Sequence, residues 1–195
     1  MYRFFISAVL ILILSAGVHA QVKTWVVDKA HSHVGFSIAH LMIYDVQGDF
    51  NDYDVQLISG SEDFSDASVQ VEIRTTSIDT DNEKRDTHLR SSDFFEVAKN
   101  PTITFKSKSF RKVGDQKYKI TGDLKMNGET KEVVLDALYR GQTKDPWGNT
   151  RTGFKATTVL DRYDYGLKYN SALETGGFLI GQEVTVLIDL QFVLK

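Results

Sequence analysis

Four histidines lie beyond the first twenty residues, and His31 and His33 are separated by one residue only. On a β-strand an H-x-H pair directs both imidazole rings to one face, where two nitrogens can bind a metal. His40 and His88 are candidates for further ligands. The apolar residues that follow His33 have the opposite parity, which favours an outward polar face for the pair. No third ligand follows at a diagnostic spacing, so we expect no bound metal, and a metal-dependent enzyme stays an alternative.

The residues needed for nucleophilic catalysis are missing or scattered. The chain has no cysteine and no G-x-S-x-G nucleophile elbow. Gly176 and Gly177 lie in a loop before the last apolar run, and no basic residue follows them at a phosphate-binding spacing. We therefore predict no catalytic residue and do not expect an enzyme.

Arg85, His88 and Arg90 form the most concentrated group of polar donors. Arg85 and His88 are three residues apart, so on a helix they share a face. If that helix covers the end of a barrel, these donors can meet the polar head of a ligand at the mouth. The alternative is a solvated helix face on which Glu83 and Asp86 are the ion-pair partners. The sequence leaves both open.

The elements that must position these residues are strands. Apolar and polar residues alternate with a period of two, the pattern of a strand with one buried face. The alternation is clearest at residues 34–38, 69–73, 118–126 and 184–192, and shorter runs occur at 24–28, 47–57, 102–108, 133–139 and 153–162. Asn127-Gly128 between two such runs predicts a tight hairpin. No helical run separates the strands after residue 102, which favours an antiparallel meander.

One segment breaks the alternation. Thr80 followed by Glu83 has the spacing of a helix capping box, which predicts a short helix over residues 81–90 with Thr80 as its N-cap. This helix is too polar for a core position, and apolar residues, Phe94 and Phe95 among them, follow it. We expect it to lie across one end of the β-structure as a cap.

About eight strands and one short helix in a chain of 195 residues, 42% hydrophobic and 25% charged, are typical of a globular all-β domain. Alternation alone fits a sandwich or a closed barrel. A barrel of eight strands can fill its interior with side chains or enclose one small ligand. The pattern does not choose between these, so a ligand-free structural barrel is a second alternative.

The first twenty residues have the features of a secretory signal peptide. Arg3 precedes an apolar run over residues 4–14, and Val18 and Ala20 suit the positions before a signal-peptidase cut. The run is too short to cross a bilayer, and without cysteine we expect no lipid anchor attached through a thiol. We expect cleavage near Ala20, export of residues 21–195 as one domain, and no integral membrane protein.

The net charge of −3 makes a nucleic-acid partner unlikely on physical grounds, because binding to phosphate backbones needs a basic surface. The oligomeric state is not readable from the sequence, and a homodimer is among the options. Transient contact with a membrane surface is compatible with the composition.

The chain resembles the YceI family of bacterial periplasmic lipid-binding proteins from residue 25 to its C-terminus. The motifs that carry the resemblance are Trp25-Val26-Val27-Asp28, His31-Ser32, Val34-Gly35-Phe36, Val46-Gln47-Gly48-Asp49-Phe50, Ser77-Ile78-Asp79-Thr80, Arg85-Asp86-x-His88-Leu89, Ser92-Asp93-Phe94-Phe95, Pro101-x-Ile103-x-Phe105, Thr121-Gly122-Asp123-Leu124-x-Met126-Asn127-Gly128 and Arg162-x-Asp164-x-Gly166-Leu167. His33 is not part of this pattern, which weakens the metal hypothesis further.

The resemblance implies an eight-stranded antiparallel lipocalin-like barrel with a short helical cap and an apolar cavity. The implied ligand is a long-chain lipid or isoprenoid, such as a quinone, a polyprenyl phosphate or a fatty-acid derivative, with no other cofactor. The implied role is transport or storage in the periplasm. Parity, capping and resemblance together predict the following ligand-binding residues: Phe36, Ile38, Val71, Ile73, Arg85, His88, Phe94, Phe95, Phe105, Leu124, Met126, Phe154, Arg162 and Ile188.

Overall fold

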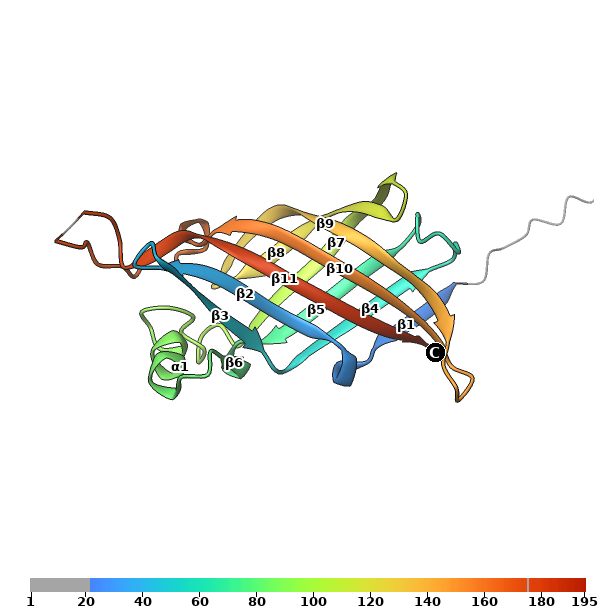
Figure 1. The fold of residues 1–195 in the computed structure, drawn as a ribbon, viewed down its shortest axis with the longest axis horizontal. Helices are drawn as coiled ribbons and strands as arrows, with labels where there is room; N and C mark the ends of the chain where they lie inside the picture. Colours follow the sequence, from blue (N-terminus) through green and yellow to red (C-terminus); the bar gives the residue numbers. More distant parts are fainter. Residues whose placement is uncertain (1–21, 175) are drawn as a thin grey trace, which may run out of the picture.

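The computed structural model describes residues 22–174 and 176–195 (Figure 1). The predicted signal peptide, residues 1–20, lies outside the described residues. The strands are β1 (Lys23–Val27), β2 (His33–His40), β3 (Tyr44–Phe50), β4 (Tyr53–Ser59), β5 (Ser68–Arg74), β6 (Ile78–Asp79), β7 (Thr102–Gly114), β8 (Lys117–Met126), β9 (Glu129–Lys144), β10 (Thr150–Asp161) and β11 (Ile180–Leu194). The helix is α1 (Glu83–Arg90), and short 3₁₀ turns are η1 (Lys29–His31), η2 (Thr75–Ser77) and η3 (Arg162–Tyr165). No helix in these two stretches is long and apolar enough to cross a membrane.

The sheet closes on itself. Every ladder is antiparallel, and β1 pairs with β4 on one side and with β11 on the other. Trp25 lies opposite Leu57 of β4 and opposite Leu194 of β11. A sandwich would leave free edges between two sheets, whereas this pairing removes them. The structure therefore decides the choice that alternation left open, in favour of a barrel.

The eleven strand segments of the described chain occupy eight positions around the barrel. β1 and β2 both pair with β11, so they are two parts of one long strand that η1 interrupts. The next position is shared by β4, which pairs with β1, and β3, which pairs with β2. The position after that is shared by β5, which pairs with β4, and β6, which pairs with β3, and η2 lies between β5 and β6 in the chain. The predicted fold, an eight-stranded antiparallel barrel with one short helix, is confirmed.

The hairpin at Asn127-Gly128 is also confirmed. It joins β8 to β9, with Met126 opposite Glu129. Asn127 and Gly128 have φ angles of 51° and 84°, the left-handed values that a two-residue hairpin turn needs and that Asn and Gly tolerate best. From β7 to β11 each strand pairs with the next one in the chain, so the predicted meander is confirmed as well.

One end of the barrel is filled by aromatic side chains. Phe64, in the loop between β4 and β5, is completely buried and packs against Trp25, Tyr139 and Phe154, with ring centroids 5.6, 5.5 and 5.2 Å away. Phe110 adds a further ring 5.7 Å from Phe154. We call these five residues the aromatic plug. It closes the end of the barrel that holds β1 and the C-terminus, opposite α1 (Figure 1).

Phe154 was predicted to bind ligand, but the structure places it away from the cavity wall. Its side chain points inward, as its parity requires, and is only 6% exposed. It lies in the aromatic plug, however, and does not line the cavity described below. Parity decides which side of a strand faces the interior, but it does not decide how deep along the barrel axis a residue lies.

The helix begins later than predicted, and its cap is a different residue. Asn82 is the N-cap, and its side chain accepts a hydrogen bond from the backbone N–H of Arg85. Thr80 instead forms hydrogen bonds to a residue inside the helix. Its backbone N–H and its Oγ1 donate to Oδ1 of Asp86 at 3.0 and 2.5 Å, and both residues are buried. Thr80 therefore fixes α1 to the strand β6 that precedes it.

The loops at the α1 end are joined through one side chain. Asn127 donates from Nδ2 to the carbonyl oxygen of Tyr165 at 2.9 Å, and its Oδ1 accepts from Nδ2 of Asn100 at 2.7 Å. The β8–β9 turn thus holds both the segment after α1 and the last residue of η3. These contacts keep the covering loops in place over the open end of the barrel.

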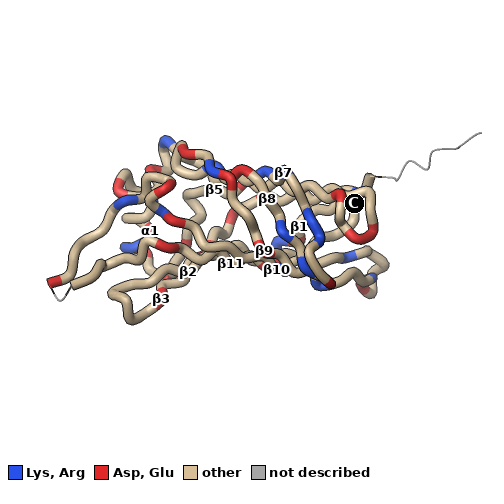
Figure 2. The backbone as a smooth tube through the Cα atoms, turned by 90° about the horizontal axis from the view of Figure 1, so that it is seen from above, with Lys and Arg blue, Asp and Glu red and all other residues tan. Residues whose placement is uncertain are grey.

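The outer surface carries charges of both signs, interspersed along the barrel (Figure 2). Many pair across neighbouring strands, as in Lys108 with Asp123 at 2.6 Å and Lys155 with Asp189 at 2.7 Å. Such exposed pairs add little to stability. Their positions do mark the outward face of each strand, which leaves the apolar parity for the interior.

Replacing Phe154 by alanine tests the aromatic plug. The change removes a ring that contacts four other rings, and a core Phe→Ala substitution costs about 3–5 kcal/mol. We expect the free energy of unfolding in urea to fall by that amount. Val159→Ala on the same strand, at a side chain that is 56% exposed, is the control and should cost under about 1 kcal/mol. Equal losses for the two variants would show that the plug is not a stability centre.

Thr80→Val tests the attachment of α1. The variant keeps the shape of the side chain but removes the hydroxyl that donates to the buried carboxylate of Asp86. Leaving such an acceptor unpaired lowers the free energy of unfolding by about 1–3 kcal/mol. We expect faster amide hydrogen exchange in α1 together with lower stability. Thr87→Val, at an exposed position of the same helix, should leave exchange unchanged. Unaltered exchange in Thr80→Val would contradict the role given to Thr80.

Candidate ligand-binding cavity

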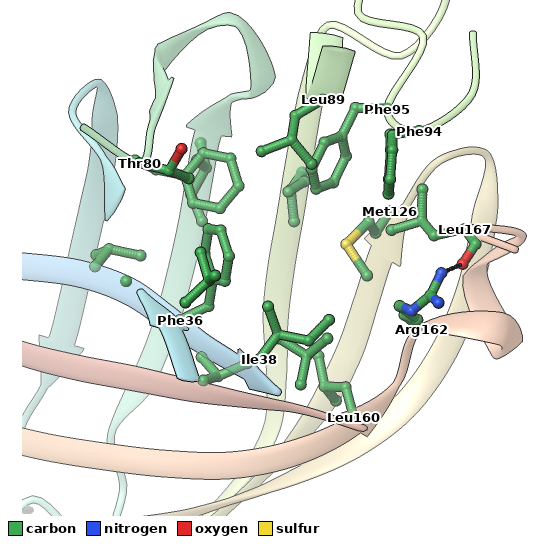
Figure 3. A pocket seen from close by; sticks show the side chains of 18 of the residues that line it. Phe36, Ile38, Thr80, Leu89, Phe94, Phe95, Met126, Leu160, Arg162 and Leu167 are labelled. Carbon is green, nitrogen blue, oxygen red and sulfur yellow. Dashed lines mark hydrogen bonds between the residues drawn. The ribbon is translucent and has the colours of Figure 1, made fainter. Parts of the chain in front are cut away.

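A cavity of about 470 Å³ lies inside the barrel between the aromatic plug and α1. This volume is within the range of small-molecule sites, which are mostly apolar and largely preformed. Thirteen of the fourteen predicted ligand-binding residues line it: Phe36, Ile38, Val71, Ile73, Arg85, His88, Phe94, Phe95, Phe105, Leu124, Met126, Arg162 and Ile188. Strands from all around the barrel contribute to the wall, and α1 contributes from above (Figure 3). Whether these residues bind a ligand stays a prediction.

Sequence reasoning missed part of the wall. Val184, Val186 and Leu190 flank Ile188 in the same alternation and were available from parity alone. Leu167 and Tyr169 had no such signal, because they lie after η3 in an irregular segment. Their place over the cavity follows from the loop contacts at the α1 end.

Two glycines shape the wall by giving room to aromatic rings. A Cβ atom at Gly48 would lie 2.5 Å from Cζ of Phe36, and one at Gly122 would lie 2.5 Å from Cζ of Phe105. The outer edge of each ring therefore lies against the glycine of a neighbouring strand. The absence of a side chain at these positions lets the rings line the cavity instead of filling it.

The part of the wall beneath α1 is aromatic. His88 on α1 lies edge to face against Phe94 and Tyr169, with ring centroids 5.0 and 4.7 Å away. Its Nε2 is 2.8 Å from Oδ2 of Asp93. His88 thus lies at the cavity as predicted, with one nitrogen already engaged by a carboxylate.

The two arginines of the helical segment have different surroundings. Arg85 lines the cavity, and its Nε and Nη2 donate to Oγ1 and the carbonyl oxygen of Thr80 at 2.7 and 2.6 Å. Arg90 does not reach the cavity. Its donors bind the carbonyl oxygens of Thr76 and Ile78 at 3.0 and 2.7 Å, so it serves the attachment of the helix. Nη1 of Arg90 also lies 3.9 Å from Oε1 of Glu83, so the ion-pair alternative holds in part for Arg90, whereas among the described residues Arg85 has no such pair.

Arg162 is the most deeply buried charged group in the wall, with only 3% of its surface exposed. Its Nε donates to the carbonyl oxygen of Gly181 at 2.7 Å and its Nη1 to that of Leu167 (Figure 3). The ring of Tyr163 lies 4.8 Å from Cζ. Burial lowers the pKa of Arg162, and the nearby Asp161 and Tyr163 offset this only in part. Among the described residues its Nη2 has no hydrogen-bond partner.

The histidines do not gather into a metal centre. Nδ1 of His31 is 3.0 Å from Asp28, and Nε2 of His33 is 3.4 Å from Asp49. His33 and His40 begin and end β2, so they lie at opposite ends of one strand. In the part of the chain that the structure describes, no three side chains of the His, Cys, Asp or Glu type are arranged to hold a metal.

Comparisons with known proteins agree with this architecture. A UPF0312 protein of Staphylococcus epidermidis is 39% identical over 166 residues, which cover 85% of this chain and 94% of that protein. The crystal structure of a Campylobacter jejuni YceI protein superposes with a TM-score of 0.69 at 33% identity, covering 86% of this chain and 96% of that one. A Saccharophagus degradans domain, described as polyisoprenoid binding, has the same fold with a TM-score of 0.67 at 14% identity, over 88% of this chain and 98% of that one.

The YceI-like domain model matches residues 25–192, from Trp25 in β1 to Phe192 in β11. The match includes every residue that lines the cavity and most of the strands β1 and β11 that close the barrel. The resemblance inferred from the motifs is therefore confirmed, and the chain belongs to the YceI-like family.

Proposed function

We propose that this barrel binds one long-chain isoprenoid or similar lipid and carries or stores it in the periplasm. The observation that carries the proposal is the cavity of about 470 Å³, whose wall is built almost entirely from aliphatic and aromatic side chains. Polar side chains occur mainly near α1 and η3, where the cavity approaches the open end. This arrangement suits a molecule with a long apolar chain and one polar end.

The energetics of such binding need no catalytic group. Each CH₂ removed from water contributes about 0.8 kcal/mol, so several isoprene units outweigh the cost of ordering the chain. Ile38, Val71 and Ile188 present branched aliphatic surfaces that suit the methyl branches of an isoprenoid. The ligand class named for the Saccharophagus domain agrees with this chemistry. A periplasmic location is supported by the signal-like residues 1–20.

A carrier of a water-insoluble chain has to exchange it with a membrane, and the cavity end of the barrel has a surface that suits transient contact. Met42, Ile43, Tyr44 and Phe178 are 66, 84, 69 and 61% exposed. We call these four residues the apolar tip. Tyr44 begins β3 after the β2–β3 turn, and that turn hydrogen-bonds to the loop before β11. Both segments lie at the α1 end of the barrel (Figure 1).

The backbone of the apolar tip is strained in a way that favours display of its side chains. Leu41 and Met42 have φ angles of 54° and 61°, values that turns usually assign to Gly or Asn. Bulky apolar residues in this conformation cost stability, and such local strain tends to occur at functional sites. Because His40, next to the turn, lines the cavity, the tip is continuous with the cavity mouth.

Ile38→Trp tests the cavity as the lipid site. The larger ring fills space between the strands and α1, so we expect a loss of most of the lipid that is retained during purification. The protein is purified from the periplasm without denaturation, extracted with organic solvent, and examined by mass spectrometry and elemental analysis. Ser37→Trp, on the opposite face of the same strand, should retain lipid as the wild type does.

The same extraction separates the proposed function from its alternatives. Stoichiometric long-chain lipid in the wild type supports the carrier. Stoichiometric zinc or copper without lipid would favour the metal-dependent alternative. Neither lipid nor metal, with no uptake of added apolar dyes, would favour a ligand-free structural barrel.

Ile43→Asp tests the apolar tip. We expect the wild type to float with phosphatidylglycerol-containing vesicles in a density gradient and the variant to remain unbound, because a charge cannot enter the apolar part of the bilayer cheaply. Trp147→Asp, at a side chain 81% exposed in the β9–β10 loop of the plug end, is the matched control and should still float. A wild-type dimer that the Ile43 change dissociates, with no vesicle binding, would instead identify the tip as a contact between two copies.

A further inference from the structure

Arg162 differs from the other cations at the cavity in its burial and in having, within the described residues, a buried Nη2 without a hydrogen-bond partner. Within the described residues no carboxylate oxygen lies within 4.0 Å of its guanidinium nitrogens. Asp161, its neighbour in the chain, accepts from the backbone N–H of Tyr163 and from Nε2 of Gln182 instead. Two carbonyl oxygens and one ring reduce the cost of burying the guanidinium, but none of them carries a negative charge.

An arginine side chain cannot escape burial by losing its proton, since its pKa is too high. A buried charge without a counter-ion is costly, and a buried donor without an acceptor adds to that cost. Nη2 of Arg162 is such a donor. The site therefore lacks one negatively charged acceptor at the cavity wall, and a planar guanidinium matches a carboxylate or phosphate best.

Of the other cations at the cavity, Lys84 is exposed to solvent, and Arg85 and His88 already have protein partners. Nε and Nη2 of Arg85 are occupied by Thr80, and Nε2 of His88 is beside Asp93. Neither of these side chains is buried as Arg162 is. A purely structural role for Arg162, holding the segment between η3 and β11, accounts for its bonds to Gly181 and Leu167 but not for Nη2.

We infer that the lipid of this cavity has an anionic head, a carboxylate or a phosphate, and that Nη2 of Arg162 binds it. The inference rests on the proposed function and narrows its ligand class. It places the head near η3 and the chain along the aliphatic wall toward the aromatic plug. Arg162 thereby determines specificity, because neutral lipids of equal chain length leave its charge without a partner.

The test compares two probes with the same chain, geranylgeranyl monophosphate and geranylgeraniol, by titration against delipidated protein followed by tryptophan fluorescence. We expect the wild type to bind the phosphate at least about ten-fold tighter than the alcohol, the ratio typical of a charge-assisted hydrogen bond. In Arg162→Gln, whose amide can still donate to a loop carbonyl, the two probes should bind equally, with the alcohol affinity unchanged. Arg111→Gln, at an exposed position of β7 that does not line the cavity, is the matched control and should keep the preference.

The other possible results of this titration distinguish a failure of the inference about the head group from a failure of the proposed lipid-binding function. Equal binding of both probes to the wild type, or a preserved preference in folded Arg162→Gln, overturns the inference while the lipid-binding function stands. No binding of either probe overturns both. Tight binding of inorganic phosphate alone, lost in Arg162→Gln, would make Arg162 a site for a free anion and overturn the lipid-head assignment.

Near-ultraviolet circular dichroism shows whether Arg162→Gln folds. If it does not fold, a second variant, Arg162→Lys, tests the inference. Arg162→Lys keeps the charge but loses the planar fork, so the phosphate affinity should fall several-fold while the alcohol affinity stays. An equal loss for both probes would point to a structural role alone and overturn the inference.

Discussion

The pairing of β1 with β11 turns an antiparallel sheet into a barrel, and the cavity depends on it. Trp25, Val26 and Val27 supply that ladder, opposite the last residues of β11. With the ladder closed, every strand of the described chain except the two-residue β6 is paired on both sides, and each inward side chain faces other side chains across the lumen. Without it, the same alternation would give an open sheet whose apolar face needs a different partner.

The interior is divided by side-chain size. Large rings, among them Phe64 and Phe154, meet at one end and exclude a ligand there. Toward α1 the wall combines aliphatic and aromatic side chains, and the absence of a side chain at Gly48 and Gly122 gives room to the rings of Phe36 and Phe105. A close-packed interior and a cavity therefore coexist in one barrel, which gives stability at one end and binding capacity at the other.

The polar groups around the cavity are distinguished by their partners. Arg85, His88 and Arg90 looked alike in the sequence, yet Arg90 is bound to backbone carbonyls away from the cavity, and the other two already have protein acceptors. Arg162 retains a donor with no acceptor in the described chain. A ligand's head group is best sought where the protein leaves a buried charge without its counter-ion.

The sequence by itself determined the strands, their inward faces, the Asn127-Gly128 hairpin and the existence of a short helix, because these follow from periodicity and turn chemistry within a few residues. It also carried the family, through motifs distributed over the chain. Only the tertiary structure decided that the sheet closes, that Phe154 lies in the plug, that Thr80 holds Asp86 and leaves the cap to Asn82, and that loop residues such as Leu167 cover the cavity. Each of these depends on contacts between residues far apart in the chain or on depth along the barrel axis, and a period of two residues contains neither.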